Sequence, residues 1–208
     1  MQLYTRGHLP MFFYTDDLAA MRKKFEEAMT EAGGTVVAVD DDFEADSCMA
    51  ITTKWVLDLS KGLDAVTLLS DAAGKAYAQE MHRQHLELRA QSNTPGHAQI
   101  DLVQGELTKN GLTAVPRQNF DGLSWSSRVS SSITANQSFQ LIFLQSDAFA
   151  HCVAVDTRGP TYRFFDLNAG EARFTTAAAL SRAFNNWAWK MGFMQANKGG
   201  AVVTRATS

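Results

Sequence analysis

The chain has 208 residues, of which 45% are hydrophobic and 20% are charged, and its formal net charge is −3. This composition is typical of a globular domain and excludes an intrinsically disordered chain. The slightly acidic balance argues against a nucleic-acid partner and against binding to an anionic membrane surface. Two cysteines are too few for the disulfide framework of a small secreted protein.

The N-terminal segment MQLYTRGHLP lacks the apolar stretch of a Sec signal peptide. No apolar run approaches the roughly 18 residues that a membrane-spanning helix requires. We therefore expect no membrane span, and export only by a route whose signal is not a hydrophobic segment.

The first half of the chain has the apolar spacing of helices. Apolar residues repeat at steps of three and four from Leu18 to Met29, and Gly33 and Gly34 then provide a stop. The same reasoning predicts helices over residues 16–34, 47–62, 64–91 (with a break near Gly74) and 98–111, a short β-branched run at 35–39 and a turn at 92–97.

From about residue 136 the spacing becomes that of strands, and a helix and one more strand follow. The predicted strands span 138–146, 149–156, 161–166, 171–174 and 199–206, and the helix spans 175–193. Helices followed by an antiparallel sheet indicate an α+β fold. We expect a single domain over residues 1–208, with a helical half of about 1–111, a sheet half of about 136–208 and a cleft between them.

The helix predicted over residues 175–193 has two threonines, Thr175 and Thr176, that could cap its first turn. Phe184 lies off the apolar line of this helix and is expected to tolerate substitution better than a residue on that line. The residues expected to be buried recur every four positions: Ala179, Ala183, Trp187 and Met191.

Cys48 follows an acidic, loop-like segment and begins an amphipathic run. With Asp46 or Ser47 as the cap, Cys48 lies in the first turn of a helix, where unpaired N–H groups favour the thiolate. Cysteine is, however, among the most buried residue types, and Cys48 shares an apolar stripe with Ile51 and Trp55. This stretch alone leaves both a nucleophile and a core thiol open, and it favours the core thiol.

His151 and Asp166 lie in two predicted strands that the turn TRGP (157–160) joins. If Asp156 and Thr161 face each other across this turn, His151 and Asp166 also lie directly opposite, with Cβ atoms about 4.5–5.5 Å apart. A carboxylate at that distance fixes the imidazole tautomer and stabilises the protonated ring. A purely structural His–Asp pair fits this pattern equally well.

Cys152 follows His151 directly, so its side chain is expected to point to the opposite face of the strand and into the core. This placement disfavours a disulfide between Cys48 and Cys152. A nucleophilic cysteine needs a base, and the base needs an orienting group. Taken together, the chain offers Cys48, His151 and Asp166 as a coherent catalytic set.

His82 and His85, in the segment HRQH, lie three residues apart on one face of a predicted helix and are potential metal ligands. No third ligand lies near them in sequence, and the chain has no CxxC or other zinc-type spacing. We therefore expect no metal site and no cofactor.

The segment DSCMAITTKWV resembles the nucleophile helix of the YopT-type cysteine peptidases, a group of bacterial effector proteases. The segment HCVAVDTRGPTYRFFDLNAGEARF is similar to the His strand and the Asp strand of that family, which have HAVAV-like and FFDPNFGEF-like sequences. Outside these stretches, the chain matches the family only in order and length.

The resemblance implies a papain-like α+β fold, in which the helical N-terminal half carries the cysteine and a C-terminal antiparallel sheet carries the other two residues. It implies that Cys48 is the nucleophile, His151 the general base and acid, and Asp166 the orienting carboxylate. The implied activity is that of a cysteine protease, without a cofactor, which acts through a thioester on a specific protein. The implied setting is an effector or toxin delivered into a host or competitor cell, and the resemblance admits a cognate chaperone or inhibitor as a further partner.

The segment before Cys48 departs from the papain-like pattern. Papain-like enzymes usually carry Gln or Asn a few residues before the cysteine as an oxyanion donor, whereas residues 40–46 read DDDFEAD. The Cys48 backbone N–H can still donate, but a nearby carboxylate would oppose a developing oxyanion. Deamidation of glutamine or acyl transfer by the same triad therefore stays open beside proteolysis, as does a non-catalytic binding protein in which Cys48 is a buried thiol.

Overall fold

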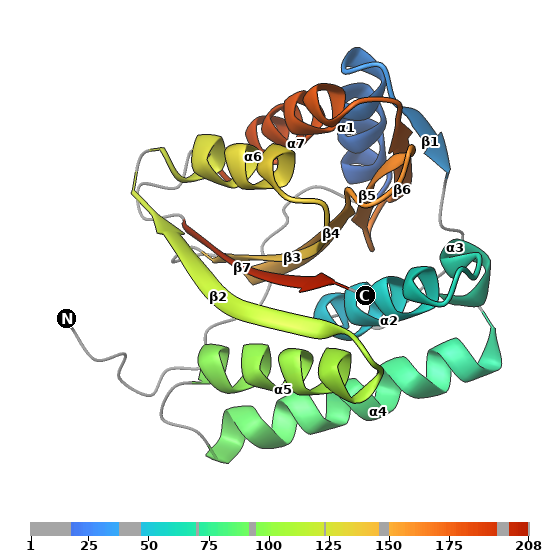
Figure 1. Ribbon diagram of the computed structural model, residues 1–208, viewed down its shortest axis with the longest axis vertical. Helices are drawn as coiled ribbons and strands as arrows, with labels where there is room; N and C mark the ends of the chain where they lie inside the picture. Colours follow the sequence, from blue (N-terminus) through green and yellow to red (C-terminus); the bar gives the residue numbers. More distant parts are fainter. Residues whose placement is uncertain are drawn as a thin grey trace.

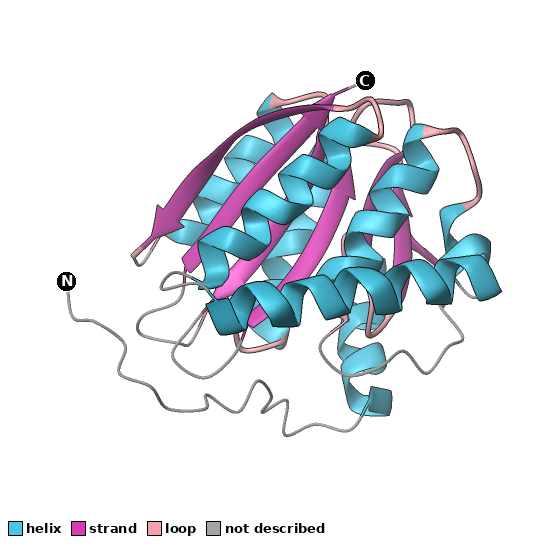
Figure 2. Cartoon of the chain, turned by 90° about the horizontal axis from the view of Figure 1, so that it is seen from below, coloured by secondary structure: helices cyan, strands magenta, loops and turns pink. Residues whose placement is uncertain are grey.

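In a computed structural model, the chain forms a seven-stranded antiparallel sheet with helices on both faces (Figures 1 and 2). The structure describes residues 18–37, 47–69, 71–91, 95–122, 124–145, 150–194 and 200–207. Within these residues the strand order is β1-β6-β5-β4-β3-β7-β2. This mixture of helices and an antiparallel sheet confirms the predicted α+β class.

The helices are α1 (Leu18–Glu31), α2 (Cys48–Ser60), α3 (Ala65–Leu69), α4 (Ala72–Gln91), α5 (Pro95–Lys109), α6 (Trp125–Ala135) and α7 (Ala177–Lys190). The strands are β1 (Thr35–Val37), β2 (Thr113–Asp121), β3 (Phe139–Gln145), β4 (Ala150–Asp156), β5 (Tyr162–Asp166), β6 (Gly170–Phe174) and β7 (Gly200–Thr207).

Two helices end at the glycines that the sequence analysis identified as stops. Gly33 has a φ of 85°, in the left-handed region that glycine adopts without a steric penalty. The N–H of Gly34 then donates to the carbonyl of Met29 at 2.9 Å, which closes a Schellman motif after α1. Gly62 ends α2 in the same way, with a φ of 72°. These helix ends therefore follow from local sequence.

The helix predicted over residues 64–91 consists of two helices, α3 and α4, with the break between Leu69 and Ala72. Gly74 lies in the first turn of α4, where its N–H donates to Oδ1 of Asp71 at 2.6 Å. A Cβ atom at Gly74 would lie 2.3 Å from the carbonyl oxygen of Leu68. Glycine at this position thus permits the close approach of α3 to α4.

Residues 113–121 form a strand, β2, and residues 125–135 form a helix, α6, and neither element was expected from the sequence. Among the described residues, β2 pairs only with β7, at one edge of the sheet. Its register shifts between Val115 and Gln118, a stretch that contains Pro116, which has no N–H to donate. The interrupted pairing explains why exposed and partly buried residues do not alternate regularly along this strand.

The sheet separates two apolar cores, which lie on its opposite faces (Figure 1). Helices α1, α6 and α7 cover the first core, which includes Phe25 and Phe164. Helices α2, α3, α4 and α5 enclose the second core, where Trp55 packs near Phe165. The consecutive residues Phe164 and Phe165 of β5 point into different cores because side chains alternate along a strand.

Helix α7 packs on the sheet, but its buried face differs from the expected one: Met191, which was expected to be buried, follows the end of the helix and is only partly buried. The hydroxyl of Thr176 accepts a hydrogen bond from the N–H of Ala179 at 3.1 Å, as expected for a cap. Trp187 is buried as predicted, but Phe184 is also 0% exposed. Trp125 of α6 meets the Phe184 ring edge-on, with centroids 6.3 Å apart. Because α7 contacts both α6 and the sheet, its buried face is wider than a single stripe.

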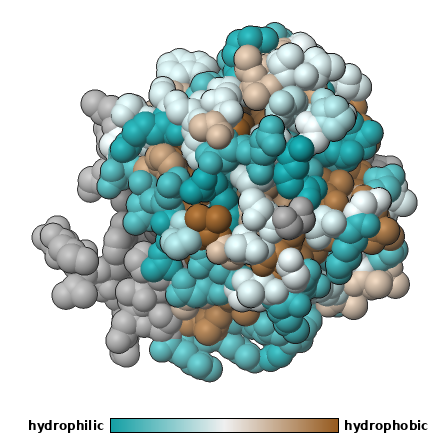
Figure 3. Space-filling view, in the orientation of Figure 1, coloured by the Kyte–Doolittle hydropathy of each residue, from teal (hydrophilic) through white to brown (hydrophobic). Residues whose placement is uncertain are grey.

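No helix in the described part of the chain combines the length and the apolar content needed to cross a membrane. On the face shown in Figure 3, apolar side chains form separate patches among hydrophilic ones.

Candidate active site

Cys48 is the first residue of α2, and its side chain is partly exposed. The first backbone hydrogen bond of the helix runs from the N–H of Ile51 to the carbonyl of Ser47, at 2.9 Å. The N–H groups of Cys48, Met49 and Ala50 therefore have no acceptor within the helix, and their partial positive charge lies beside the thiol. Residues 40–46, where the sequence analysis found no amide donor, lie outside the described residues.

His151 is the second residue of β4, and it is 5% exposed. Two aromatic rings pack near its imidazole, those of Phe193 and Trp187, with centroids 6.1 Å and 6.3 Å away. The Phe193 ring is almost parallel to the imidazole, at 9°. These contacts hold the ring in one plane and exclude water from most of it.

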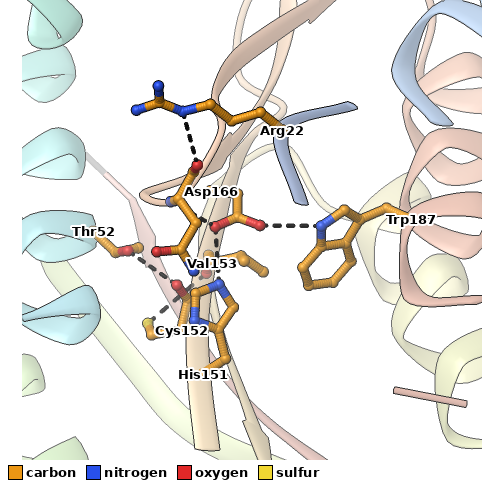
Figure 4. Close-up of polar contacts among 8 residues, drawn as sticks. Arg22, Thr52, His151, Cys152, Val153, Asp166 and Trp187 are labelled. Atoms are coloured by element: carbon orange, nitrogen blue, oxygen red, sulfur yellow. Dashed lines mark hydrogen bonds and ion pairs between the residues drawn. The ribbon is translucent and has the colours of Figure 1, made fainter. Parts of the chain in front are cut away.

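Asp166 ends β5 and is 0% exposed, and three donors surround its carboxylate. Its Oδ1 lies 2.9 Å from Nε2 of His151 and accepts a hydrogen bond from the N–H of Asn168 at 3.0 Å. Its Oδ2 accepts a hydrogen bond from Nε1 of Trp187 at 3.1 Å. The guanidinium of Arg22, on α1, donates to the carbonyl of Asn168 and so anchors the turn between β5 and β6 (Figure 4).

The expected contact between His151 and Asp166 is present, but the expected register is wrong. Asp166 pairs across the strands with Val153, and Asp156 pairs with Arg163, so the ladder is shifted by two residues from the prediction. A two-residue shift keeps every side chain on its face. His151 is therefore the diagonal neighbour of Asp166, a separation that an imidazole can span. The connection between the strands is longer than the four-residue turn assumed from TRGP.

Burial of the His151 ring opposes its protonation, but the charge of Asp166, the hydrogen bond with Asp166 and a further hydrogen bond with Cys48 outweigh this effect. Together they raise the pKa of His151 to about 10. Since Nε2 faces Asp166, the other ring nitrogen, Nδ1, is the one left for the thiol. The imidazole thus lies between a buried carboxylate and the cysteine at the start of α2.

Cys152 points away from His151 into the core beneath α2, as the alternation predicted. It is 1% exposed, and both cysteines are free thiols. Burial raises the pKa of the Cys152 thiol, and the nearby Cys48 raises it further. The Cys152 carbonyl accepts a hydrogen bond from Oγ1 of Thr52 at 3.2 Å, which links α2 to β4 (Figure 4).

Trp187 is a site residue that the sequence analysis assigned only to the buried face of a helix. Figure 4 shows its indole on the opposite side of the strands from Thr52, with its N–H directed at Asp166. A buried tryptophan usually finds an acceptor for this N–H, so a Trp in the apolar stripe was itself a signal. Which acceptor it finds depends on how α7 lies on the sheet.

The histidine pair of α4 lies apart from this set. Burial lowers the pKa of His85 to about 4, and the neighbouring His82 adds to the effect. Among the residues that the structure describes, no group of three or more His, Cys, Asp or Glu side chains could hold a metal ion.

The arrangement therefore places a thiol at a helix N-terminus, an imidazole beside it and a carboxylate behind the imidazole. Such a relay is suited to nucleophilic attack by a thiolate with proton transfer through the imidazole. It combines α2 with two consecutive strands, β4 and β5, that lie far from α2 in sequence.

Comparison with solved structures identifies the fold. The chain matches the crystal structure of the Pseudomonas avirulence protein AvrPphB with a TM-score of 0.64 and 16% sequence identity, over 86% of this chain and 100% of that chain. It also matches PatoxP, a cysteine protease-like domain of the Photorhabdus asymbiotica toxin PaTox, with a TM-score of 0.46 and 12% identity, over 89% of this chain and 58% of that one. A comparison with curated protein sequences gave no significant match.

The family comparison covers nearly the whole chain. Residues 20–201 match the model of the peptidase C58 family, described as Yersinia/Haemophilus virulence surface antigen. The matched range contains Cys48, His151 and Asp166, and the papain-like α+β fold agrees with it. The chain therefore belongs to the peptidase C58 family and is a papain-like enzyme of the cysteine protease type.

Proposed function

We propose that the protein is a cysteine protease in which Cys48 is the nucleophile, His151 the general acid and base, and Asp166 the orienting carboxylate. The observation that carries this proposal is the position of His151, whose ring lies 2.9 Å from the Asp166 carboxylate and close enough to Cys48 for the thiol to help raise the pKa of the imidazole. The substrate is a specific protein, and the enzyme acts as an effector delivered into a host or competitor cell. Membership of the peptidase C58 family supports this setting.

The first half of the reaction forms a thioester. The Cys48 thiolate attacks the carbonyl carbon of the scissile peptide bond, and the N–H groups at the start of α2 stabilise the oxyanion that develops. Protonated His151 gives its proton to the departing amine as the carbon–nitrogen bond breaks. The N-terminal fragment of the substrate is then bound to Cys48 through its carbonyl carbon, as a thioester.

The second half restores the enzyme. Neutral His151 takes a proton from a water molecule, whose oxygen attacks the thioester carbon. The carbon–sulfur bond breaks, and the Cys48 thiolate reforms beside protonated His151. Asp166 remains ionised throughout, since its role is to orient the ring and stabilise the imidazolium.

A proteome-wide comparison tests the reaction and its substrate together. Wild type, Cys48→Ala and, as a matched control, Cys152→Ala would each be expressed in target cells. New protein N-termini are expected with wild type and with Cys152→Ala and not with Cys48→Ala. Deamidated glutamine or acylated lysine in place of new N-termini would contradict proteolysis while keeping the triad. No Cys48-dependent change of any kind would contradict catalysis.

A substrate-independent test uses iodoacetamide between pH 5 and 8. An activated thiolate reacts well below the pH range in which a free thiol ionises. We expect fast alkylation of Cys48 at pH 6 in the folded protein. Alkylation that requires unfolding would instead indicate a core thiol.

A further inference from the structure

Glu171 is a buried charged residue that the proposed reaction does not use. It lies in β6 and is 0% exposed. Its Oε2 accepts a hydrogen bond from Nε1 of Trp55 at 3.0 Å. Its Oε1 accepts hydrogen bonds from Arg163 at 3.1 Å and from Arg173 at 2.6 Å. A buried carboxylate is costly unless it is paired and hydrogen-bonded, and here both oxygens are occupied.

The two carboxylate oxygens of Glu171 face different parts of the molecule. Oε1 faces two guanidinium groups of the sheet, from β5 and β6, which are partly exposed and balance the negative charge. Oε2 faces α2, where the indole of Trp55 is its donor. The arginines thus neutralise the charge of Glu171, and the hydrogen bond from Trp55 links the sheet to α2.

The indole of Trp55 is held by its face as well as by its N–H. It stacks on Phe165, with ring centroids 5.2 Å apart and planes at 13°. Phe165 and Glu171 are directly paired across the β5–β6 ladder. One cross-strand pair therefore supplies both a stacking surface and an acceptor to the same indole. The residue after Phe165 is Asp166, whose side chain points to the opposite face.

Trp55 follows Cys48 by seven residues, which is about two helical turns and brings both to the same side of α2. The contacts of the Trp55 indole therefore help to fix the rotation of α2 about its own axis. That rotation decides where the Cys48 thiol lies relative to His151 and Asp166.

We propose that Glu171 is a positioning residue for the proposed reaction: through its hydrogen bond to Trp55 it holds the Cys48 helix against the hairpin that carries Asp166. This inference rests on the proposed function of Cys48. We expect loss of the hydrogen bond between Trp55 and Glu171 to slow the reaction of the Cys48 thiol, although this bond lies about two helical turns from Cys48. A misplacement of about 1 Å at a reacting atom can cost about a hundredfold in rate.

The test measures the rate constant for alkylation of Cys48 by iodoacetamide from pH 5 to 9, by intact-protein mass spectrometry. Trp55→Phe removes the N–H donor and keeps a ring to stack on Phe165. Glu171→Gln keeps the side-chain shape and leaves a single acceptor oxygen, which Arg163 and Arg173 draw to the Oε1 position, so that an NH2 group faces the indole N–H and the hydrogen bond to Trp55 is lost. Each variant is expected to lower the rate at pH 6 about tenfold or more while far-ultraviolet circular dichroism still shows a folded protein.

A matched control separates positioning from general stability. Trp125→Phe alters a buried tryptophan in the other core, next to Phe184 and outside the proposed site. It is expected to lower Tm without changing the alkylation rate. Because Trp55 and Glu171 act through one hydrogen bond, the double variant Trp55→Phe/Glu171→Gln is expected to be no slower than the slower single variant.

The outcomes are distinguishable. Fast alkylation of wild type together with unchanged rates in folded Trp55→Phe and Glu171→Gln would overturn the positioning role and leave the proposed function standing. Multiplied losses in the double variant would also overturn it. If Trp55→Phe does not fold, the rate of Glu171→Gln decides alone. Slow alkylation of wild type at pH 6 would contradict the proposed function, and the role of Glu171 with it.

Discussion

Nε2 of His151 lies 2.9 Å from Oδ1 of Asp166, although the cross-strand partner of Asp166 is Val153. The contact is thus diagonal, across two residues of register, and Trp187 holds the second carboxylate oxygen from the other side. This geometry explains how a pair that is not directly opposed can still form a buried relay. It also indicates which substitutions should disturb the pair.

The two cysteines are expected to respond differently to the same substitution. Cys48→Ser should abolish proteolysis and leave the fold intact, because a site built around a cysteine and a histidine seldom activates a hydroxyl. Cys152→Ser should keep the reaction and lower the free energy of unfolding by about 1–3 kcal/mol if the buried hydroxyl is unpaired. New N-termini in target cells and urea unfolding check the two expectations. Loss of the reaction in Cys152→Ser alone would show that the assignment is reversed.

The His151 imidazole is expected to remain protonated well above neutral pH. Its pKa is raised to about 10, so its contribution to stability is fully present below pH of about 6.5 and is lost as the pH rises through about 10. The difference in unfolding free energy between wild type and His151→Asn should therefore shrink over that range. Urea unfolding at a series of pH values measures it, and a difference that grows with pH would contradict the ion pair.

Asp166→Asn should lower the pKa of His151, because burial of the ring then opposes protonation without the carboxylate. Titration of the ring by NMR gives this pKa directly. Alkylation of Cys48 should slow less than in His151→Ala, since asparagine can still orient the ring. An unchanged His151 pKa would mean that another group maintains the imidazolium.

Trp187→Phe should affect both stability and reactivity. The substitution keeps an aromatic ring in the core but removes the donor to Oδ2 of Asp166, a loss of about 1–3 kcal/mol for a buried acceptor left unsatisfied. The alkylation rate of Cys48 should fall, because Asp166 then loses one of the three groups that hold its carboxylate toward His151. Trp125→Phe is the control, and equal alkylation rates in the two variants would show that Trp187 only fills space.

Two glycines in helices should respond with opposite sign to the same change. Gly74→Ala should destabilise the protein, because the new Cβ would meet the Leu68 carbonyl oxygen at 2.3 Å. Gly105→Ala, in α5, meets nothing within 4 Å and should stabilise by about 0.5–1 kcal/mol, since alanine favours the helix. Thermal unfolding compares them, and stabilisation of both would mean that α3 can move away from α4.

The sequence was sufficient for features that depend on local spacing. Helices α1 and α2 end at glycines, which adopt a positive φ without strain. Helix α7 begins after a threonine whose hydroxyl accepts a hydrogen bond from an N–H of the first turn. The alternation in β4 placed His151 and Cys152 on opposite faces, and it holds because strand geometry has a period of two. The selection of Cys48, His151 and Asp166 also came from sequence, through their order, their surroundings and the family resemblance.

Tertiary structure alone decided the rest. The length of the connection between β4 and β5 set the register, so that Asp166 pairs with Val153 and meets His151 diagonally. The burial of Phe184 and the edge strand β2 depend on which elements pack beside them. The hydrogen bonds of Asp166 with Trp187 and of Glu171 with Trp55 join residues 21 and 116 positions apart. Spacing along the chain cannot specify such contacts, because they form only when whole helices are oriented on the sheet.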